Sequence, residues 1–513
     1  MCGILFYMNQ VCILNTDSIK CRGPDQSETK LIGRHSVGFT RLSINDTTVL
    51  GMQPMKCGRW SMVCNGEIYN YKQLKKDLYN FTSESDCEVI VKLLYNTDGN
   101  IQQVYRMLDG EFAFIGTNGD RVVVARDHVG VRPLYMQLDP NGKPFVFSSL
   151  IKGLELTNMS SSIFHFPPGY VYDSDQGFIS MEPEFVYTKL PYSQNSIFDL
   201  LCASVKKRIN NTDRNIGFLL SGGLDSTILV CIAKFILKLD KIQTFSVGFH
   251  KDSPDLKYAR EVANFVGSYH NEYILDIEKA YERIPEIISN IETYDCTTVR
   301  ASVPMYLMCE KINKETTIKV LLSGEGSDEI FNGYIYSHRA PTYNDLFIDS
   351  CELLKNIHEF DGLRADRCVG SWGLELRVPF LDKEFVRYVM EVHPLNKVSD
   401  TVIEKKILRD TFRNCIPESV YRRSKNGMSD AVGSEWIQYI KERCEQIPDV
   451  VYAELKIKYN NLNRPVSKEE AWYRELYHAY FPDEICNPQS TIWRPKWTRE
   501  TDPSARKLEQ FVE

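Results

Sequence analysis

The stretch NIGFLLSGGLDS at residues 215–226 decides the fold of the larger part of this 513-residue chain. It begins as a short apolar run typical of a buried strand and passes through a glycine-rich turn, after which an apolar stretch of helical length follows over 227–239. Helical stretches such as 256–266 alternate with further strand-like runs at 242–249, 272–275 and 317–322. This alternation predicts a parallel sheet covered by helices on both faces.

The turn at 221–226 has the composition of an anion-binding site. Successive backbone N–H groups of Ser221, Gly222 and Gly223 at the start of a helix form a nest that suits a phosphate. No GxxxxGK[ST] pattern occurs in the chain, so this is not a Walker A loop. Asp225 and Ser226 in place of that lysine suggest pyrophosphate held with magnesium, the alternative being a plain tight turn.

A second turn of the same kind follows 102 residues later, because the chain repeats Leu-Leu-Ser-Gly at 219–222 and 321–324. Asp225 follows the first copy and Asp328 the second. Ligands bind at the carboxyl ends of parallel strands, so both turns belong at the same edge of the sheet. We therefore predict that the two carboxylates share one Mg²⁺, with nucleotide phosphates completing its shell; the alternative is a solvated acidic turn.

The first part of the chain has a different pattern. Short β-like runs separated by Gly, Asn and Asp lie at 61–63, 112–116, 121–125 and 144–148, and one helix is expected over 85–95. Proline-containing turns near 167, 183 and 191 mark a boundary. We predict two domains, 1–188 and 189–513. The second becomes mainly helical beyond Pro341, and its tail after Pro482 is expected to be irregular.

Cys2 is the candidate nucleophile of the first domain. Removal of Met1 would place a thiol beside a free α-amine, whose pKa near 8 lets it act as a base close to neutral pH. Alone, a cysteine at this position is weak evidence for catalysis. The other groups that change this are an Arg in RLSI at 41–44 and another in RGPD at 22–25, either of which suits a substrate carboxylate.

Asn65 and Gly66 supply what a developing oxyanion needs, since a side-chain amide and a backbone N–H can point at it together. Asp86 would pair with a substrate ammonium group. Each residue alone also fits a surface ion pair or a turn. Together they provide a nucleophile, an oxyanion site and charge partners for an amino acid, which is what hydrolysis of a glutamine amide requires.

Composition excludes several other classes of protein. The chain has 61 basic and 68 acidic residues with no basic tract, which argues against nucleic-acid binding. No apolar run reaches the length of a membrane span, and no secretory signal is present. Fifteen Cys without CxxC or HExxH patterns predict reduced, mostly buried thiols, no zinc motif and a cytoplasmic enzyme. The oligomeric state stays open, and a homodimer is one arrangement.

An ordered series of motifs along nearly the whole chain resembles the glutamine-hydrolysing asparagine synthetases. The matching stretches are MCGI at 1–4, RGPD at 22–25, RLSI at 41–44, NGEIYN at 65–70, SDCEVI at 85–90, RDHVGVRPLY at 126–135, SGGLDS at 221–226, IETYDCTTVRAS at 291–302, LSGEGSDEIFNGY at 322–334 and WGLELRVPFLD at 372–382. The resemblance implies an N-terminal αββα glutaminase sandwich, followed by a parallel-sheet α/β synthetase domain of the PP-loop type with a helical C-terminal part.

The resemblance also implies a two-step activity. Ammonia released from glutamine would pass through an internal tunnel to a second site, where ATP and Mg²⁺ convert aspartate to β-aspartyl-AMP and then to asparagine. Catalytic positions would be Cys2, Asn65, Gly66 and Glu325. Glutamine would contact Arg41, Leu42, Ser43, Ile44, Asn45, Asn65, Gly66, Glu67 and Asp86. ATP would contact Leu219, Ser221, Gly222, Gly223, Asp225, Ser226, Val247, Ser323, Gly324, Asp382 and Lys425, with Asp225 and Asp328 on the metal.

The chain departs from the family pattern at three places. Only nineteen residues separate Cys2 from Arg22, so we expect a helix of the glutaminase domain to be missing. Asn332 stands where a glycine is common, and Asn-Gly-Met follows Lys425 where an acid, Gln and Phe are usual. The competing functions are a β-lactam-forming synthetase, an inactive regulatory homologue and a free-standing glutaminase. The intact Cys2 constellation and the intact acids of both turns argue against all three.

Overall fold

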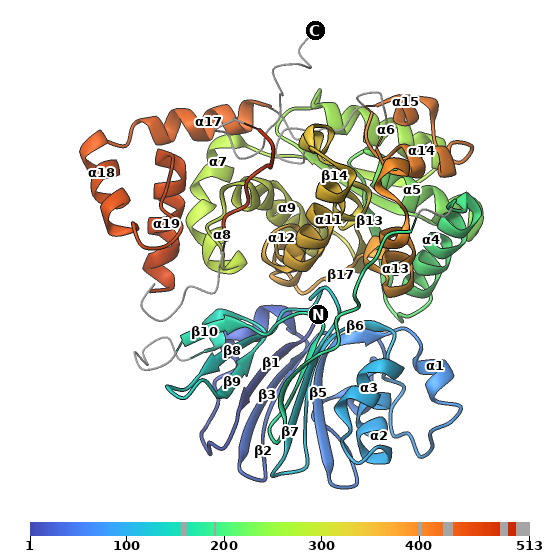
Figure 1. Ribbon diagram of the computed structural model, residues 1–513, viewed down its shortest axis with the longest axis vertical. Helices are drawn as coiled ribbons and strands as arrows, with labels where there is room; N and C mark the ends of the chain where they lie inside the picture. The colour runs from blue at the N-terminus through green and yellow to red at the C-terminus, as the bar shows by residue number, and fades with distance from the viewer. Residues whose placement is uncertain (155–161, 189–190, 399–402, 424–433, 483–490, 499–513) are drawn as a thin grey trace.

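The computed structural model describes residues 1–154, 162–188, 191–398, 403–423, 434–482 and 491–498. The chain forms two stacked domains, and its N-terminus lies between them (Figure 1). The first domain ends with β12 (Gly177–Ser180), and the second begins with α4 (Gln194–Ile209). The boundary that we predict between residues 188 and 189 falls in this connection.

Two six-stranded antiparallel sheets form the first domain. The first sheet has the order β10 (Ser162–His165), β8 (Tyr135–Leu138), β9 (Pro144–Ser148), β1 (Gly3–Tyr7), β3 (His35–Arg41) and β2 (Gln26–Ile32). The second has the order β12, β11 (Tyr170–Asp173), β7 (Val122–Arg126), β6 (Gly110–Thr117), β5 (Trp60–Ile68) and β4 (Met55–Cys57). Helices α2 (Glu88–Asn96) and α3 (Ile101–Met107) pack on the second sheet, and the short α1 (Tyr71–Leu74) lies nearby. The predicted sandwich is confirmed.

Strand β1 shows how the domains are joined. Ile4 and Phe6 face the second sheet and pack into the inner core of the sandwich, whereas Leu5 and Tyr7 belong to the large apolar core shared with the second domain. The alternation of a strand therefore buries both of its faces. Between β1 and Arg22 the regular element is the six-residue 3₁₀-helix η1 (Asp17–Arg22), which packs on β1 and β3 together with η3 (Ile151–Gly153) close by.

The second domain is built on a five-stranded parallel sheet, as predicted. Its order is β15 (Tyr269–Ile274), β14 (Gln243–Gly248), β13 (Asn215–Leu219), β16 (Ile318–Leu322) and β17 (Glu375–Arg377). The strand order reverses between β13 and β16, so a crevice forms at the carboxyl ends of these two strands. Both Leu-Leu-Ser-Gly turns lie there. Helices α5 (Leu224–Cys231), α6 (Pro254–Val266), α9 (Cys296–Glu315) and α12 (Asp361–Gly370) pack against the strands.

The predicted helix over 227–239 starts earlier and changes its geometry. It begins at Leu224, directly after the glycine-rich turn, and continues as the π-helical turn η4 (Ile232–Ile236). Most of the remaining chain is helical, as expected, with β17 as an exception beyond Pro341. These helices are α7 (Ile277–Glu282), α8 (Ile284–Ile291), α10 (Ser327–Phe331), α11 (Tyr343–Asn356), α13 (Lys383–Glu391), α14 (Lys406–Phe412), α15 (Glu418–Arg422), α17 (Ser434–Glu445), α18 (Asp449–Lys458) and α19 (Lys468–Tyr480).

Among the residues that the structure describes, no helix combines the length and the apolar character needed to cross a bilayer.

Candidate active sites

Cys2 lies at the start of β1, between the two domains. Its backbone nitrogen donates a hydrogen bond to Asn65 Oδ1 at 2.9 Å, and its thiol lies 3.8 Å from the Leu42 carbonyl oxygen. Burial raises the pKa of the Cys2 thiol to about 11, against the lowering effect of the nearby N-terminal amine. The thiol is therefore protonated at neutral pH and needs a base before it can attack a carbonyl carbon.

Asn65 has the free donor that an oxyanion site requires. The Asn65 side chain is fully buried, its Oδ1 is used by Cys2, and its Nδ2 has no hydrogen-bond partner among the described residues. A buried amide donor without a partner costs free energy unless a ligand meets it. Gly66 follows on β5, where a Cβ would overlap the backbone of Glu111 and Phe112, so only glycine fits.

The segment 41–45, which we predict to bind glutamine, borders the Cys2 thiol at Leu42. Arg41 is buried, and its guanidinium donates to the Gln26 side chain and to the carbonyl oxygens of Asp46 and Thr48. Leu42 contributes the carbonyl next to the Cys2 thiol. Residues 43 and 44 are held by both domains. The Ser43 N–H donates to the Asp25 side chain in the first domain. From the second domain, the Arg214 side chain donates to the Ser43 carbonyl, and the backbone N–H of Asp213 donates to the Ile44 carbonyl. The backbone of Ser43 and Ile44 is therefore held partly by the second domain.

Glu67 is neutralised across the domain boundary. Its Oε2 accepts from Asn45 at 2.7 Å in the first domain, and it contacts Asn211 at 2.8 Å and Arg377 at 2.9 Å in the second domain. Burial and the nearby Asp86 raise the pKa of Glu67, and Arg377 opposes this. Asp86 is buried beside it and accepts from the Ile68 N–H at 2.6 Å.

Met1 contacts the second domain directly, and Cys2 is linked to it through Arg22. The amine of Met1 lies 3.5 Å from Glu375, and the Arg22 guanidinium donates to the Cys2 carbonyl at 3.1 Å. Arg22 also makes a two-point ion pair with Asp366 of α12. Although burial opposes its ionisation, Arg377 and the N-terminal amine lower the pKa of Glu375 to about 2.

The first glycine-rich turn lies between β13 and α5, and its role as an anion nest stays a prediction. Gly222 has a φ of +67°, and a Cβ there would overlap the backbone of Tyr258 and Ala259, so this position requires glycine. The Gly223 N–H donates to Ser221 Oγ at 3.2 Å, and Ser221 Oγ lies 3.2 Å from Ser226 Oγ. Leu219 is the last residue of β13, and Val247 is the last but one of the neighbouring strand β14.

The structure brings the two predicted metal carboxylates together. Lys405 Nζ lies 2.6 Å from Asp225 Oδ2 and 2.8 Å from Asp328 Oδ1, and Ser327 Oγ donates to Asp225 Oδ1 at 2.7 Å. Although burial opposes its charge, the two aspartates raise the pKa of Lys405 above its usual value. The two carboxylates thus already share one cation, and this donor set of two acidic oxygens fits a hard divalent ion.

Glu325 and Ser323 occupy the second turn. Glu325 Oε2 accepts from Arg364 at 2.8 Å and its Oε1 lies 3.4 Å from Ser323 Oγ. Burial raises the pKa of Glu325, and Arg364 opposes this. The Ser323 N–H donates to the Arg377 carbonyl at 3.0 Å. Arg377 of β17 therefore contacts Glu67 through its side chain and the second glycine-rich turn through its backbone. Gly324 packs against Asp225 of the first turn.

Two further residues, Asp382 and Lys425, stay predicted ATP contacts. The ion pairs of Asp382 go to Lys207 and Arg208 of α4, and its Oδ1 caps α13 by accepting from the Glu384 N–H at 3.2 Å. Although burial opposes its ionisation, Arg208 and Lys207 lower the pKa of Asp382 to about 2. These contacts of Asp382 stabilise the packing of α4 and the start of α13. Lys425 and the Asn-Gly-Met that follows it lie outside the described residues.

The structure explains why asparagine is tolerated at position 332. It has a φ of +52° at the end of α10, in the left-handed region where glycine is favoured and asparagine is the best-tolerated alternative. Its Nδ2 donates to the Leu346 carbonyl at 3.2 Å and to Ser350 Oγ at 2.9 Å. The substitution of a common glycine therefore keeps the backbone turn and adds an anchor to α11.

Sequence reasoning missed four residues that complete these sites: Asn211, Arg377, Lys405 and Arg423. Arg423 Nη1 lies 3.4 Å from the Ser221 carbonyl, and its Nη2 pairs with Asp255 at 2.6 Å. Arg377 lies in the motif 372–382, and its charge within that motif is the signal that points to it. The remaining three are ordinary polar residues in unremarkable sequence contexts, and only the fold brings them to the sites.

Comparison with known protein families agrees with this architecture. Residues 1–164 match the glutamine amidotransferase domain family, and residues 196–354 and 349–501 match the asparagine synthase family. These matches and the fold define a two-domain glutamine amidotransferase.

Full-length relatives show to which family of glutamine amidotransferases the chain belongs. The chain is 36% identical over 566 aligned positions to an asparagine synthetase [glutamine-hydrolyzing] of Rattus norvegicus, covering 100% of this chain and 99% of the relative. The corresponding protein of Homo sapiens is 36% identical with the same coverage, and asparagine synthetase 2 of Arabidopsis thaliana is 35% identical over 99% of this chain and 94% of its own length. The chain belongs to the family of glutamine-hydrolysing asparagine synthetases.

Proposed function

We propose that this enzyme makes L-asparagine from L-aspartate, using ATP and ammonia released from L-glutamine. The products are AMP, diphosphate and L-glutamate, and the intermediate is β-aspartyl-AMP. The observation that carries the proposal is the double role of Arg377, whose side chain contacts Glu67 beside Cys2 and whose carbonyl accepts from Ser323 in the nucleotide turn. One strand thus touches both reaction centres, which supports a single two-step activity over two unrelated ones.

At the first site, the Cys2 sulfur attacks the amide carbon of glutamine. After removal of Met1, the free α-amine of Cys2 takes the thiol proton, and the negative charge on the amide oxygen is stabilised by Asn65 Nδ2 and the Gly66 N–H. Ammonia leaves with that proton, and water then cleaves the thioester to release glutamate. Arg41 and Asp86 orient the substrate carboxylate and ammonium groups, and Leu42 to Asn45 and Glu67 shape the rest of the binding surface.

At the second site, the aspartate side-chain carboxylate attacks the α-phosphorus of ATP, and diphosphate leaves. Ser221, Gly222, Gly223 and Ser226 bind its phosphates through backbone and hydroxyl groups, and Lys405 adds positive charge. Asp225 and Asp328 would hold Mg²⁺, which supplies further charge neutralisation to the leaving diphosphate when bound. Glu325, whose pKa is raised by burial, accepts a proton from the ammonia that displaces AMP. Lys425 and Asp382 stay predicted contacts of the nucleotide.

The proposal includes a cytoplasmic location. All fourteen cysteines among the described residues are free thiols, which supports a reducing compartment.

The test is product analysis with aspartate, ATP, Mg²⁺ and glutamine. Asparagine, AMP, diphosphate and glutamate are expected in equal amounts. Formation of ADP and phosphate would overturn the adenylation route. Formation of glutamate without asparagine would show that the enzyme has glutaminase activity alone. Ammonium chloride in place of glutamine serves as the control, because it should support the second step alone.

A further inference from the structure

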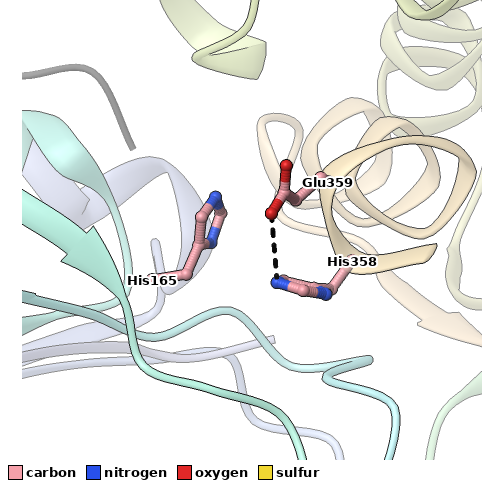
Figure 2. A group of neighbouring side chains, drawn as sticks. All are labelled: His165, His358 and Glu359. Atoms are coloured by element: carbon pink, nitrogen blue, oxygen red, sulfur yellow. Dashed lines mark ion pairs between the residues drawn. The ribbon is translucent and has the colours of Figure 1, made fainter. Parts of the chain in front are cut away.

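Two histidines and a glutamate meet at the domain interface, and none of the three is among the residues assigned to either reaction centre. His165 belongs to β10 of the first domain, and His358 and Glu359 belong to η6 (Ile357–Glu359) of the second (Figure 2). One potential ligand atom from each side chain lies within 4.8 Å of the others, the only such group found among the described residues. We propose that these three side chains bind one divalent transition-metal ion of the Zn²⁺ class and link the two domains through it.

The spacing is close to that of a metal shell. With bonds of about 2.0–2.1 Å in a tetrahedral site, neighbouring ligand atoms lie roughly 3.3 Å apart. His358 Nε2 is 4.0 Å from Glu359 Oε1, and the two imidazole rings stand perpendicular with centroids 5.0 Å apart. Small side-chain rotations therefore bring the three atoms to bonding distance. A water would complete four-coordination, as is common where a protein supplies three ligands.

The proton on His358 is placed by its neighbour. His358 Nδ1 lies 3.0 Å from the Lys355 carbonyl oxygen, which can only accept, so this nitrogen carries the hydrogen. In the neutral ring Nε2 then presents a lone pair, and Figure 2 shows it facing the carboxylate of Glu359. A cation that meets both groups stabilises a lone pair that faces a carboxylate. A backbone carbonyl that fixes the opposite ring nitrogen is also the arrangement found around metal-bound histidines in proteins.

His165 is oriented by packing. Its ring lies 4.6 Å from the ring of Tyr135, whose hydroxyl accepts from Arg367 at 3.0 Å. Burial, the neighbouring histidine and the charges of Arg126 and Arg367 lower the pKa of His165, which leaves the imidazole in the form that ligates metals. Those positive charges also disfavour a cation, and Glu359 supplies the compensating negative charge. Two imidazoles and one carboxylate suit Zn²⁺, Co²⁺ or Ni²⁺ and are poor ligands for Mg²⁺.

The position suggests what the metal does. Helix α12 follows η6 directly, and it carries Arg364, which holds Glu325, and Asp366, which holds Arg22 beside Cys2. A metal bridging β10 and η6 would fix this helix relative to the first domain. Because the ion binds the folded form and lacks these paired ligands in the unfolded chain, it should raise the thermal stability of the docked enzyme.

The first experiment uses Co²⁺ as a spectroscopic probe of the full-length, metal-free protein. One equivalent should give visible d–d absorption without the near-ultraviolet charge-transfer band of a cobalt–thiolate bond, which separates this site from the many free cysteines. The variants H165Q, H358Q and E359Q should lose the signal or weaken Co²⁺ binding at least about tenfold. H250Q is the matched control, because His250 is an exposed histidine 3.5 Å from Asp252 and should leave the signal unchanged.

Folding of each variant is checked by circular dichroism without metal, and E359Q keeps the shape of the replaced residue if a histidine variant fails to fold. The proposal is overturned if Co²⁺ gives no saturable d–d signal, if the signal carries a thiolate band, or if the three variants bind like H250Q. The second readout is the melting temperature: Zn²⁺ should raise it for the wild type and H250Q but not for H165Q. An equal rise in all three proteins would contradict the proposal.

Discussion

The two reaction centres neutralise their carboxylates in different ways. At the glutaminase site, Glu67 is neutralised by Arg377 and Asn211 from the other domain. At the synthetase site, Asp225 and Asp328 are neutralised by Lys405 from their own domain. The first site is therefore complete only when the domains are docked, whereas the second is complete within one domain. Glutamine hydrolysis should depend on the synthetase domain more than synthesis from ammonia depends on the glutaminase domain.

The sites also differ in the charge they are built to receive. Asn65 Nδ2 is a buried donor without a partner among the described residues, ready for a negative oxygen. Asp225 and Asp328 are acceptors that converge on a cation. An oxyanion and a metal–phosphate group are the matching ligands.

The largest expected effect separates the two sites completely. Cys2→Ala should lower glutamine-dependent synthesis at least about 1000-fold, because the nucleophile is lost, and leave ammonia-dependent synthesis within about twofold. Both rates are measured by asparagine formation. Retained glutaminase activity would show that another group attacks the amide.

Substitution of Asp225 or Asp328 should impair the synthetase activity and spare the glutaminase activity. Asp225→Asn or Asp328→Asn should each reduce aspartate-dependent release of diphosphate by about 100-fold or more while glutamine hydrolysis persists, since each removes a charge that holds the cation. The double variant should be little worse than either single one, because both acids serve one ion. Losses that multiply would mean that the two carboxylates act separately.

A third variant tests the free amide donor. Asn65→Ala should lower the kcat of glutamine hydrolysis by about 100-fold, the usual cost of one oxyanion-hole donor, with a smaller change in KM. Ammonia-dependent synthesis should be unaffected. If KM rises while kcat holds, Asn65 binds the ground state of glutamine and is not part of the oxyanion site.

The smallest effect tests the dependence of one site on the other domain. Arg377→Lys keeps the positive charge but loses the planar fork that reaches Glu67 and Glu375 together. We expect glutamine-dependent synthesis to fall about fivefold and ammonia-dependent synthesis to stay within twofold. Equal losses in the two assays would remove the asymmetry between the sites.

Much of this arrangement could be predicted from the sequence, because its signals are local. The turns at 221–226 and 323–329 follow apolar strands directly, and parallel strands place such turns side by side. The two domains and the sheet type follow from the change in apolar periodicity. The neighbours of Cys2 could be predicted because their residue types fit one chemistry.

The rest depended on the fold. Lys405 reaches the two aspartates from the N-cap of α14, with a φ of +56° that its own sequence does not indicate. His165 and His358 approach each other only because the domains dock. The start of the helix at Leu224 and its π-helical end are set by packing on the sheet, which overrides local propensity.

The most direct test of the account follows the nitrogen atom. The enzyme is supplied with glutamine labelled with ¹⁵N in its side-chain amide, together with unlabelled aspartate, ATP and Mg²⁺. The account predicts ¹⁵N in the side-chain amide of asparagine, with one AMP formed for each asparagine, and no labelled asparagine from Cys2→Ala. Asparagine without the label, or labelled ammonia that accumulates while ADP and phosphate form, would contradict it.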